Sequence, residues 1–370
     1  MGFRGLLTAV ALAALATTAW TTTAAAQSRL AVVQETTALT PLPALAGGRV
    51  AAGPDGWTYQ WPSVHFEAAF EGQAVLIKVG AGDQILHLSI DGVPAGRLVK
   101  PAPGLYRLDG FGPGRHLVRA AVVGEMQAGP ARFGGFFLEN GRALPLTAPR
   151  RQIEFIGDSH SVGYGDASDK RACTSDEVWS TTDNSIAFGP LTAARFGADH
   201  QVNAISGRGI VRNYGGMPGD TLPLAWPKVL LGAAPAYANA DWAPQVVVIN
   251  LGTNDFSTPL KPGEPWKDRQ ALRDDYVATY ARFAQTIRAR QPQAFLILLA
   301  PPSAENEIAA QVDRVAENLK AGGETRLAVI PVGEMELTAC DWHPSARDQQ
   351  GISARVSGFL DQRPEIWLGR

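Results

Sequence analysis

The chain has 370 residues, of which 45% are hydrophobic and 18% are charged, so it can bury sizeable cores and is not expected to be disordered. Its 33 basic and 35 acidic residues give a formal net charge of −2, and without a basic patch neither nucleic acid nor an anionic membrane is an expected partner. Two cysteines are too few for a zinc-type cluster or a dense disulfide framework, and we predict no metal site.

Residues 1–26 have the pattern of a removed signal peptide. Arg4 supplies a positive charge, an apolar run follows, and the small residues 24–26 provide a cleavage site. A retained membrane anchor is the alternative, but the apolar run is shorter than the ~20 residues that a span needs. We expect an exported protein, periplasmic or extracellular, with no membrane segment after cleavage.

Residues 39–146 predict an all-β domain. Short apolar runs with two-residue alternation are separated by Gly, Pro or Asp-Gly turns, and they cover residues 64–70, 74–79, 85–90, 116–123 and 134–138. This spacing is typical of an antiparallel sandwich, and we predict a jelly roll.

Residues 151–370 predict an α/β domain. Apolar strands at 153–157, 246–252, 295–300 and 327–332 alternate with helices at 269–291 and 305–320. Such alternation indicates a three-layer αβα domain, in which helices cover both faces of a parallel sheet. Ligands of these sheets lie beyond the carboxyl ends of the strands. A chain of 370 residues is expected to form one large domain and a smaller one, or two comparable domains, and this division fits that expectation.

Ser159 follows the first of these strands through Gly157-Asp158 and is the candidate nucleophile. A serine at such a turn could equally be a helix N-cap, so it needs partners to count as catalytic. His343, in Asp341-Trp342-His343, follows the last strand and so emerges at the same edge of the sheet. It is the candidate base, with Asp341 expected to fix its tautomer.

Two further segments could supply donors to a developing oxyanion. Asn254, in Gly-Thr-Asn-Asp, follows the strand that ends near residue 250, and its side-chain amide is a suitable donor. The glycine-rich run 205–209 could offer a backbone N–H. Taken alone, the first could be a plain turn and the second a phosphate-binding nest.

Taken in order, Gly157-Asp158-Ser159, Ser206-Gly207, residues 252–255 and residues 341–344 resemble the four sequence blocks of the SGNH (GDSL-type) hydrolases. The β-domain in front, together with residues 134–138, 151–165 and 207–216, resembles carbohydrate esterase family 2 from about Gly48 to the C-terminus. That resemblance implies a jelly roll plus an SGNH domain. It also implies removal of O-acetyl groups from polysaccharides such as xylan or glucomannan through an acetyl-enzyme on Ser159, without a cofactor.

The resemblance implies a role for each matched residue. Ser159 is the nucleophile, His343 the base and then the acid, and Asp341 the orienting acid, although some members work with a Ser-His dyad. The oxyanion donors are the Ser159 N–H, the Gly207 N–H and the Asn254 side chain. The family often has Ile-Thr-Cys after the serine, whereas this chain has His160-Ser161-Val162. We expect His160 to pack or to line the pocket.

Three tryptophans in this half, Trp226, Trp266 and Trp342, could stack on a sugar ring or pack internally, and Trp342 is the preferred pocket residue. In an oxidising compartment Cys173 and Cys340 could form a disulfide that pins the catalytic loop. Two other functions stay open: a lipase or lysophospholipase of the same superfamily, and a non-catalytic carbohydrate-binding protein on an esterase scaffold. The sequence indicates no oligomeric state.

Overall fold

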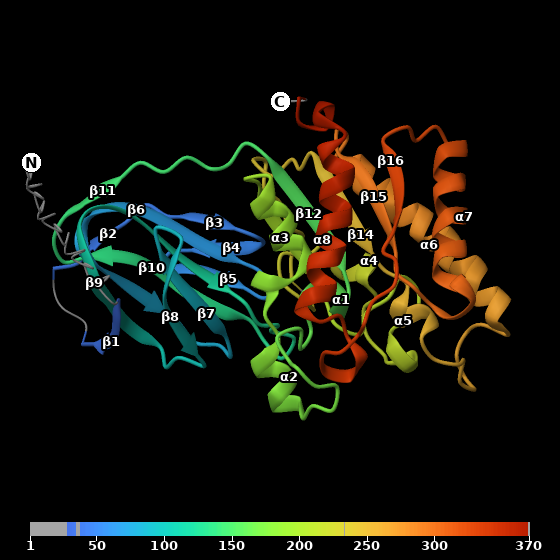
Figure 1. Cartoon of the computed structure of the whole chain (residues 1–370), viewed down its shortest axis with the longest axis horizontal. Coiled ribbons are helices and arrows are strands. Elements are labelled where there is room, and N and C mark those ends of the chain that lie inside the picture. The colour runs from blue at the N-terminus through green and yellow to red at the C-terminus, as the bar shows by residue number, and fades with distance from the viewer. Residues whose placement is uncertain (1–27, 35–37, 233, 369–370) are drawn as a thin grey trace, which may run out of the picture.

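The computed structural model describes residues 28–34, 38–232 and 234–368, so the predicted signal peptide lies outside the described residues. A β-domain and an α/β domain lie side by side, joined by a long connection from residue 145 to residue 151 (Figure 1). None of the helices in these ranges is long and apolar enough to cross a membrane.

The β-domain is a single hydrogen-bonded network of antiparallel strands around one apolar core. Its strands are β1 (Arg29–Val33), β2 (Thr40–Pro41), β3 (Leu45–Gly47), β4 (Val50–Gly53), β5 (Gly56–Tyr59), β6 (His65–Val79), β7 (Ile85–Ile90), β8 (Val93–Val99), β9 (Gly104–Val122), β10 (Ala131–Leu138) and β11 (Arg142–Leu144). The main path runs in the order β4-β5-β10-β6-β9-β7-β8.

Two long strands, β6 and β9, form the spine of this domain. They pair antiparallel from His65↔Ala121 to Val79↔Gly104, with a register shift between Gly72 and Ala74. The runs 64–70 and 74–79, predicted as two strands, are therefore one strand with an irregularity at its centre. A glycine in an alternating pattern marks a bulge as readily as a turn, which is why the sequence pattern divided this strand.

The α/β domain is built on five parallel strands in the order β13-β12-β14-β15-β16. The strands are β12 (Gln152–Gly157), β13 (Asp199–Ala204), β14 (Val246–Asn250), β15 (Phe295–Ala300) and β16 (Leu327–Pro331). The α-helices are α1 (Ser159–Val162), α2 (Ser175–Thr181), α3 (Phe188–Arg195), α4 (Leu222–Ala225), α5 (Thr253–Phe256), α6 (Arg269–Arg290), α7 (Glu307–Ala321) and α8 (Ala346–Asp361). Short 3₁₀ turns occur at Asn184–Ile186, Tyr214–Gly216, Ala304–Asn306, Cys340–Trp342 and Pro364–Trp367.

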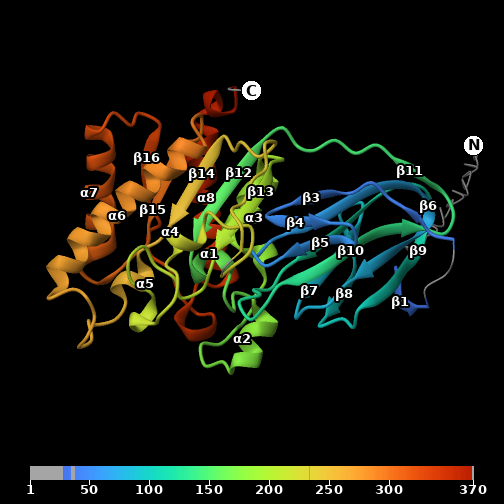
Figure 2. The same ribbon diagram turned by 180° about the vertical axis from the view of Figure 1, so that it is seen from behind.

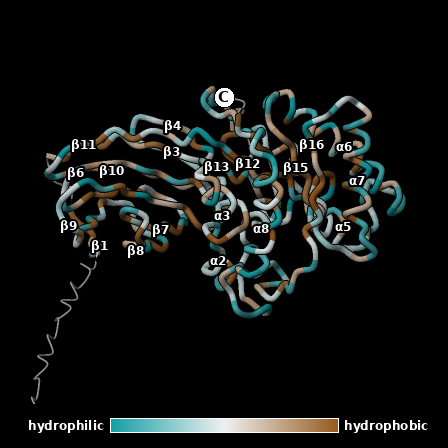
Figure 3. Tube along the Cα trace, turned by 45° about the horizontal axis from the view of Figure 1, so that its top comes forward, coloured by the Kyte–Doolittle hydropathy of each residue, from teal (hydrophilic) through white to brown (hydrophobic). Residues whose placement is uncertain are grey.

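Helices cover both faces of the parallel sheet, as Figure 2 shows from behind. Helices α3 and α8 pack on one face through Phe188, Ile352 and Val356, and α6 and α7 pack on the other through Leu272 and Val312. Hydrophobic residues follow the central strands while hydrophilic ones mark the outer surface (Figure 3). The strands are apolar along their whole length because both faces are buried.

Arg49, on the turn between β3 and β4, anchors the β-domain to the edge of this sheet. Its guanidinium is 2% exposed and lies 2.9 Å from the buried carboxylate of Glu154 on β12. It also donates to the Gln201 side chain on β13, at 3.1 Å, and to the carbonyl of Trp226. A charge this deep is stable only when it is paired and hydrogen-bonded, so these partners fix how the domains dock.

Replacing Arg49 with alanine should lower the free energy of unfolding by about 3–5 kcal/mol, because the Glu154 carboxylate would stay buried without its partner. Urea unfolding followed by tryptophan fluorescence measures this change. The control is Arg29→Ala, whose partner Asp109 lies 3.1 Å away and whose side chain is 79% exposed; it should change stability by less than about 1 kcal/mol. Equal effects of the two substitutions would contradict the anchoring role.

Candidate active site

Ser159 is the first residue of α1 and follows β12 directly. The helix is capped by Asp158, whose Oδ1 accepts a hydrogen bond from the His160 N–H at 3.1 Å. The alternative that Ser159 itself is the cap is therefore wrong, and its hydroxyl is free for other partners. Ser159 Oγ lies 2.9 Å from Nε2 of His343, which is hydrogen-bonding distance.

His343 is held by main-chain oxygens. Its Nδ1 donates to the carbonyls of Cys340, at 3.0 Å, and of Asp341, at 3.2 Å. Because a carbonyl only accepts, Nδ1 carries the proton and Nε2 is left as the acceptor that faces the Ser159 hydroxyl. This tautomer is the one that general-base catalysis needs.

The carboxylate of Asp341 makes no hydrogen bond or ion pair with His343, so the predicted orienting hydrogen bond is wrong. Asp341 and Trp342 both have positive φ, 51° and 62°, and this tight turn directs carbonyl oxygens at the imidazole. The Asp341 carboxylate instead accepts from the hydroxyl of Tyr164 at 3.0 Å. The site therefore has a Ser-His pair whose histidine is oriented by main-chain carbonyls.

Tyr164 is a site residue to which the sequence analysis assigned no role. Its ring packs on His343 with centroids 4.2 Å apart, and it lies between Gly163 and Gly165, both at positive φ. A Cβ added at Gly165 would lie 2.5 Å from Cβ of Cys340, so only glycine lets this turn pass the catalytic loop. The Gly-Tyr-Gly run was the available signal.

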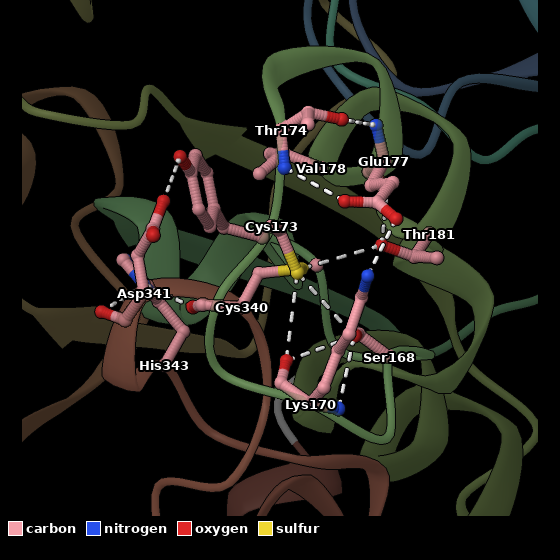
Figure 4. The surroundings of a disulfide bond; sticks show 12 residues. Ser168, Lys170, Cys173, Thr174, Glu177, Val178, Thr181, Cys340, Asp341 and His343 are labelled. Carbon is pink, nitrogen blue, oxygen red and sulfur yellow. Dashed lines mark hydrogen bonds and ion pairs between the residues drawn. A yellow bond between two sulfur atoms is a disulfide. The ribbon is translucent and has the colours of Figure 1, made fainter.

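A disulfide joins Cys173, just before α2, to Cys340, with Cα atoms 5.5 Å apart. Figure 4 shows the bridge beside Asp341 and His343. Since the carbonyl of Cys340 accepts from His343, the bridge tethers a residue that directly holds the base. The Asp341 N–H also donates to the Arg171 carbonyl at 2.7 Å, so the two loops are joined twice.

Two backbone donors lie ready for an oxyanion. Within the described residues, neither the Ser159 N–H nor the Gly207 N–H has an acceptor. Gly207 adopts φ 82°, in the left-handed region where glycine carries no steric penalty. The third candidate, Asn254 on α5, donates to Asp158 Oδ2 at 3.2 Å and to the Arg208 carbonyl at 2.9 Å. Its amide therefore has protein acceptors, and its role as an oxyanion donor stays a prediction.

The β-domain reaches this site through the loop between β9 and β10. Glu125 accepts from the backbone N–H of Ser206 at 2.8 Å, and Gln127 donates to the carbonyl of Ser206 at 3.1 Å. The backbone N–H and the carbonyl of Ser206, the residue before Gly207, are thus both held by hydrogen bonds to the β-domain. Burial raises the pKa of Glu125, while the bonds from Ser206 oppose that shift. Nothing in the sequence connected this loop to the site.

Asp255, beside Asn254, organises the rest of the oxyanion loop. Its carboxylate accepts from the N–H groups of Ile210, Val211 and Arg212 at 2.9–3.0 Å. Burial raises the pKa of this carboxyl to about 6, against the lowering effect of those three bonds. The acid of the Gly-Thr-Asn-Asp motif therefore shapes the loop that presents Gly207.

The remaining sequence candidates divide between the site and the core. His160 is buried behind the nucleophile, edge-on to His343, and burial lowers its pKa to about 3, so it stays neutral. Trp342 is 63% exposed, with the Arg171 guanidinium 3.7 Å from its ring centroid. Trp226 is 1% exposed, so the prediction that it binds sugar is wrong. Trp266 donates to Asp275 and lines a separate cleft, residues 256–269.

One group in the described part of the chain has the composition of a metal site: His65, Asp199 and His200. Asp199 and His200 begin β13, so they lie at the edge of the sheet opposite Ser159. Ser63 bonds both imidazoles, through its carbonyl to His65 and its hydroxyl to His200, and His65 lies 3.4 Å from Asp199. These contacts join the two domains, and the catalytic pair does not involve them.

Asp341→Asn should lower kcat by less than about tenfold, because the base is oriented by carbonyls that the substitution leaves in place. Ser159→Ala and His343→Ala should each cost at least about 10³-fold. Hydrolysis of p-nitrophenyl acetate measures all three. A loss with Asp341→Asn as large as that with His343→Ala would show that the carboxylate orients the base after all.

The acid limb of the pH profile should lie below pH 6.5. Burial lowers the pKa of His343, although its carbonyl partners and the Asp341 charge act in the raising direction. Since only neutral His343 can accept the serine proton, a lowered pKa keeps the enzyme active further into acid. The midpoint of kcat/KM between pH 4 and 8 tests this, and a midpoint above 6.5 would contradict it.

Glu125→Ala should reduce kcat about tenfold with little change in KM, because the Gly207 N–H would lose its fixed position. Glu125→Gln keeps an acceptor oxygen for Ser206 and should restore most of the rate. Steady-state kinetics on p-nitrophenyl acetate, with melting temperatures of all variants, separates positioning from stability. An unchanged kcat in Glu125→Ala would refute the role.

Comparisons with known proteins follow the same division of the chain. Residues 46–149 match the family model described as carbohydrate esterase 2 N-terminal, and residues 155–353 match the GDSL-like lipase/acylhydrolase family. An acetylxylan esterase / glucomannan deacetylase of Cellvibrio japonicus is 42% identical over 334 residues, covering 88% of this chain and 93% of that protein.

Solved structures agree with this match. A carbohydrate esterase whose active site displays divergent catalytic and non-catalytic binding functions superposes with a TM-score of 0.83 at 41% identity, covering 89% of this chain and all of that one. A family two carbohydrate esterase from Cellvibrio japonicus has a TM-score of 0.74 at 23% identity, covering 92% and 99%, and shares the fold.

Proposed function

The chain belongs to carbohydrate esterase family 2, and we propose that it removes O-acetyl groups from polysaccharides, xylan and glucomannan first among them, through an acetyl-enzyme on Ser159. It is a carboxylic ester hydrolase. The observation that carries the mechanism is the 2.9 Å contact between Ser159 Oγ and His343 Nε2, beside two backbone N–H groups that have no acceptor among the described residues. The substrate class is that of its 42% identical relative.

The geometry suits a two-step acyl transfer. Ser159 Oγ attacks the acetyl carbonyl while His343 Nε2 takes the hydroxyl proton, and the resulting oxyanion accepts from the N–H groups of Ser159 and Gly207. Collapse of this intermediate breaks the C–O bond to the sugar, whose oxygen takes the proton from His343. Water, deprotonated by His343, then attacks the acetyl-enzyme, and acetate and the free serine result.

Two further proposals accompany this function. Export to the periplasm or beyond is supported by the signal-like residues 1–26 and by the disulfide, because such bridges persist in oxidising compartments. A jelly-roll connectivity is supported by a strand order that departs from chain order, with β10 between β5 and β6 and β9 between β6 and β7. An acetylated glycan is the proposed partner.

Acetate release from acetylated xylan and acetylated glucomannan tests the function, with Ser159→Ala as the blank. We expect release from at least one polymer, and hydrolysis of p-nitrophenyl acetate much faster than of p-nitrophenyl octanoate. Preference for the octanoate would favour a lipase instead. Glycan binding without acetate release by the intact enzyme would favour a non-catalytic binding protein.

A further inference from the structure

A groove opens next to the proposed catalytic pair. It has a volume of about 560 Å³ and lies between the β-domain and α2. Tyr164, whose ring packs on His343, is one of its lining residues, so the groove adjoins the histidine of the candidate active site. Its walls come from both domains. Asp83, Lys100 and the β9–β10 loop line one side, and Asp176 and Trp179 of α2 line the other.

The groove has the chemistry that a neutral sugar chain requires. Aromatic rings line it on the side of the α/β domain, from Tyr164 to Trp179, and apolar sugar faces pack on such rings. Polar side chains line both walls, Asp83 and Gln127 on the side of the β-domain and Asp176 on α2, where sugar hydroxyls can donate and accept. A long acyl chain would instead need a continuous apolar lining.

Contacts within the protein hold both walls of the groove in place. On the α2 side, Thr174 and Glu177 form a reciprocal capping box, and the disulfide at Cys173 fixes the start of the helix. Arg97 of β8 donates to the Ser180 carbonyl at 3.2 Å and so ties the walls together. A site whose walls are held in place loses little conformational entropy when it binds.

Lys100 links the two walls of the groove. Its ammonium lies 4.4 Å from the centroid of the Trp179 ring and 3.6 Å from the carboxylate of Asp83. The cation covers one ring face and holds the indole in place. It also presents donors beside the path of a chain, where sugar oxygens can accept.

We propose that this groove binds the sugar units next to the one that is deacetylated, so that the polysaccharide runs from Ser159 past Tyr164 and along Trp179. This inference rests on the proposed function, because it supplies the further subsites that a polymeric substrate needs. The β-domain then forms half of the substrate cleft in addition to supporting the oxyanion loop.

Affinities for xylohexaose and mannohexaose, measured by isothermal titration calorimetry in the Ser159→Ala protein, test the groove. Adding Trp179→Ala should weaken binding of the better hexasaccharide about tenfold, and adding Lys100→Ala should weaken it at least about threefold. The matched control is Trp266→Ala, which removes a tryptophan from the separate cleft at residues 256–269 and should leave the affinity unchanged.

In the parent enzyme, Trp179→Ala and Lys100→Ala should leave kcat/KM for p-nitrophenyl acetate within about twofold, because this ester lacks the neighbouring sugar units that would contact these two side chains. An intact value also shows that each variant folds. Unchanged hexasaccharide affinity in both variants, absence of binding to either hexasaccharide, or a loss with Trp266→Ala in place of Trp179→Ala would overturn the proposal. Acetate release from polymers is scored separately and decides only the proposed function.

Discussion

The arrangement of this molecule depends on a single buried cation. Arg49 extends from the β-domain to Glu154 on β12, the strand that also leads to Ser159. The rings of Trp61, Trp226 and Tyr237 surround its guanidinium, with centroids 4.7–5.5 Å away. Because neither charge could stay in this interior alone, the two domains dock in one orientation. The catalytic edge of the sheet therefore always meets the same loops of the β-domain.

In the proposed catalytic pair, backbone carbonyls orient the histidine as a carboxylate does in a serine triad. Two carbonyls at the turn Cys340–Trp342 fix the tautomer of His343, and strained φ values and a disulfide keep that turn in shape. Burial lowers the pKa of this histidine, and the neutral carbonyl acceptors offset that effect less than a hydrogen-bonded carboxylate would. The side chain of Asp341 is thereby free to fix Tyr164.

Much of the fold and of the candidate site could be predicted from the sequence, because these features depend on local periodicity and on the order of motifs along the chain. The parallel strands, the long helices α6 and α7, and the order of Ser159, Gly207, Asn254 and His343 follow from local patterns. Contacts between residues distant in the chain could not be predicted in this way. The carbonyl of Cys340 has no signature in the sequence, and Glu125 lies in an ordinary turn of the other domain. Asp341 was assigned to His343 by proximity, but a positive φ turned its side chain away.

The hydrogen bonds between the β9–β10 loop and Ser206 make the α/β domain dependent on the β-domain. The two family models part between residues 149 and 155, as though a binding module preceded an enzyme. Yet one domain carries Ser159, the proposed nucleophile, and the other holds the backbone of Ser206 beside the proposed oxyanion donor Gly207. The β-domain and the α/β domain must therefore change together during evolution. A chimera of two relatives would have to take the β9–β10 loop and the segment around Ser206 from the same parent.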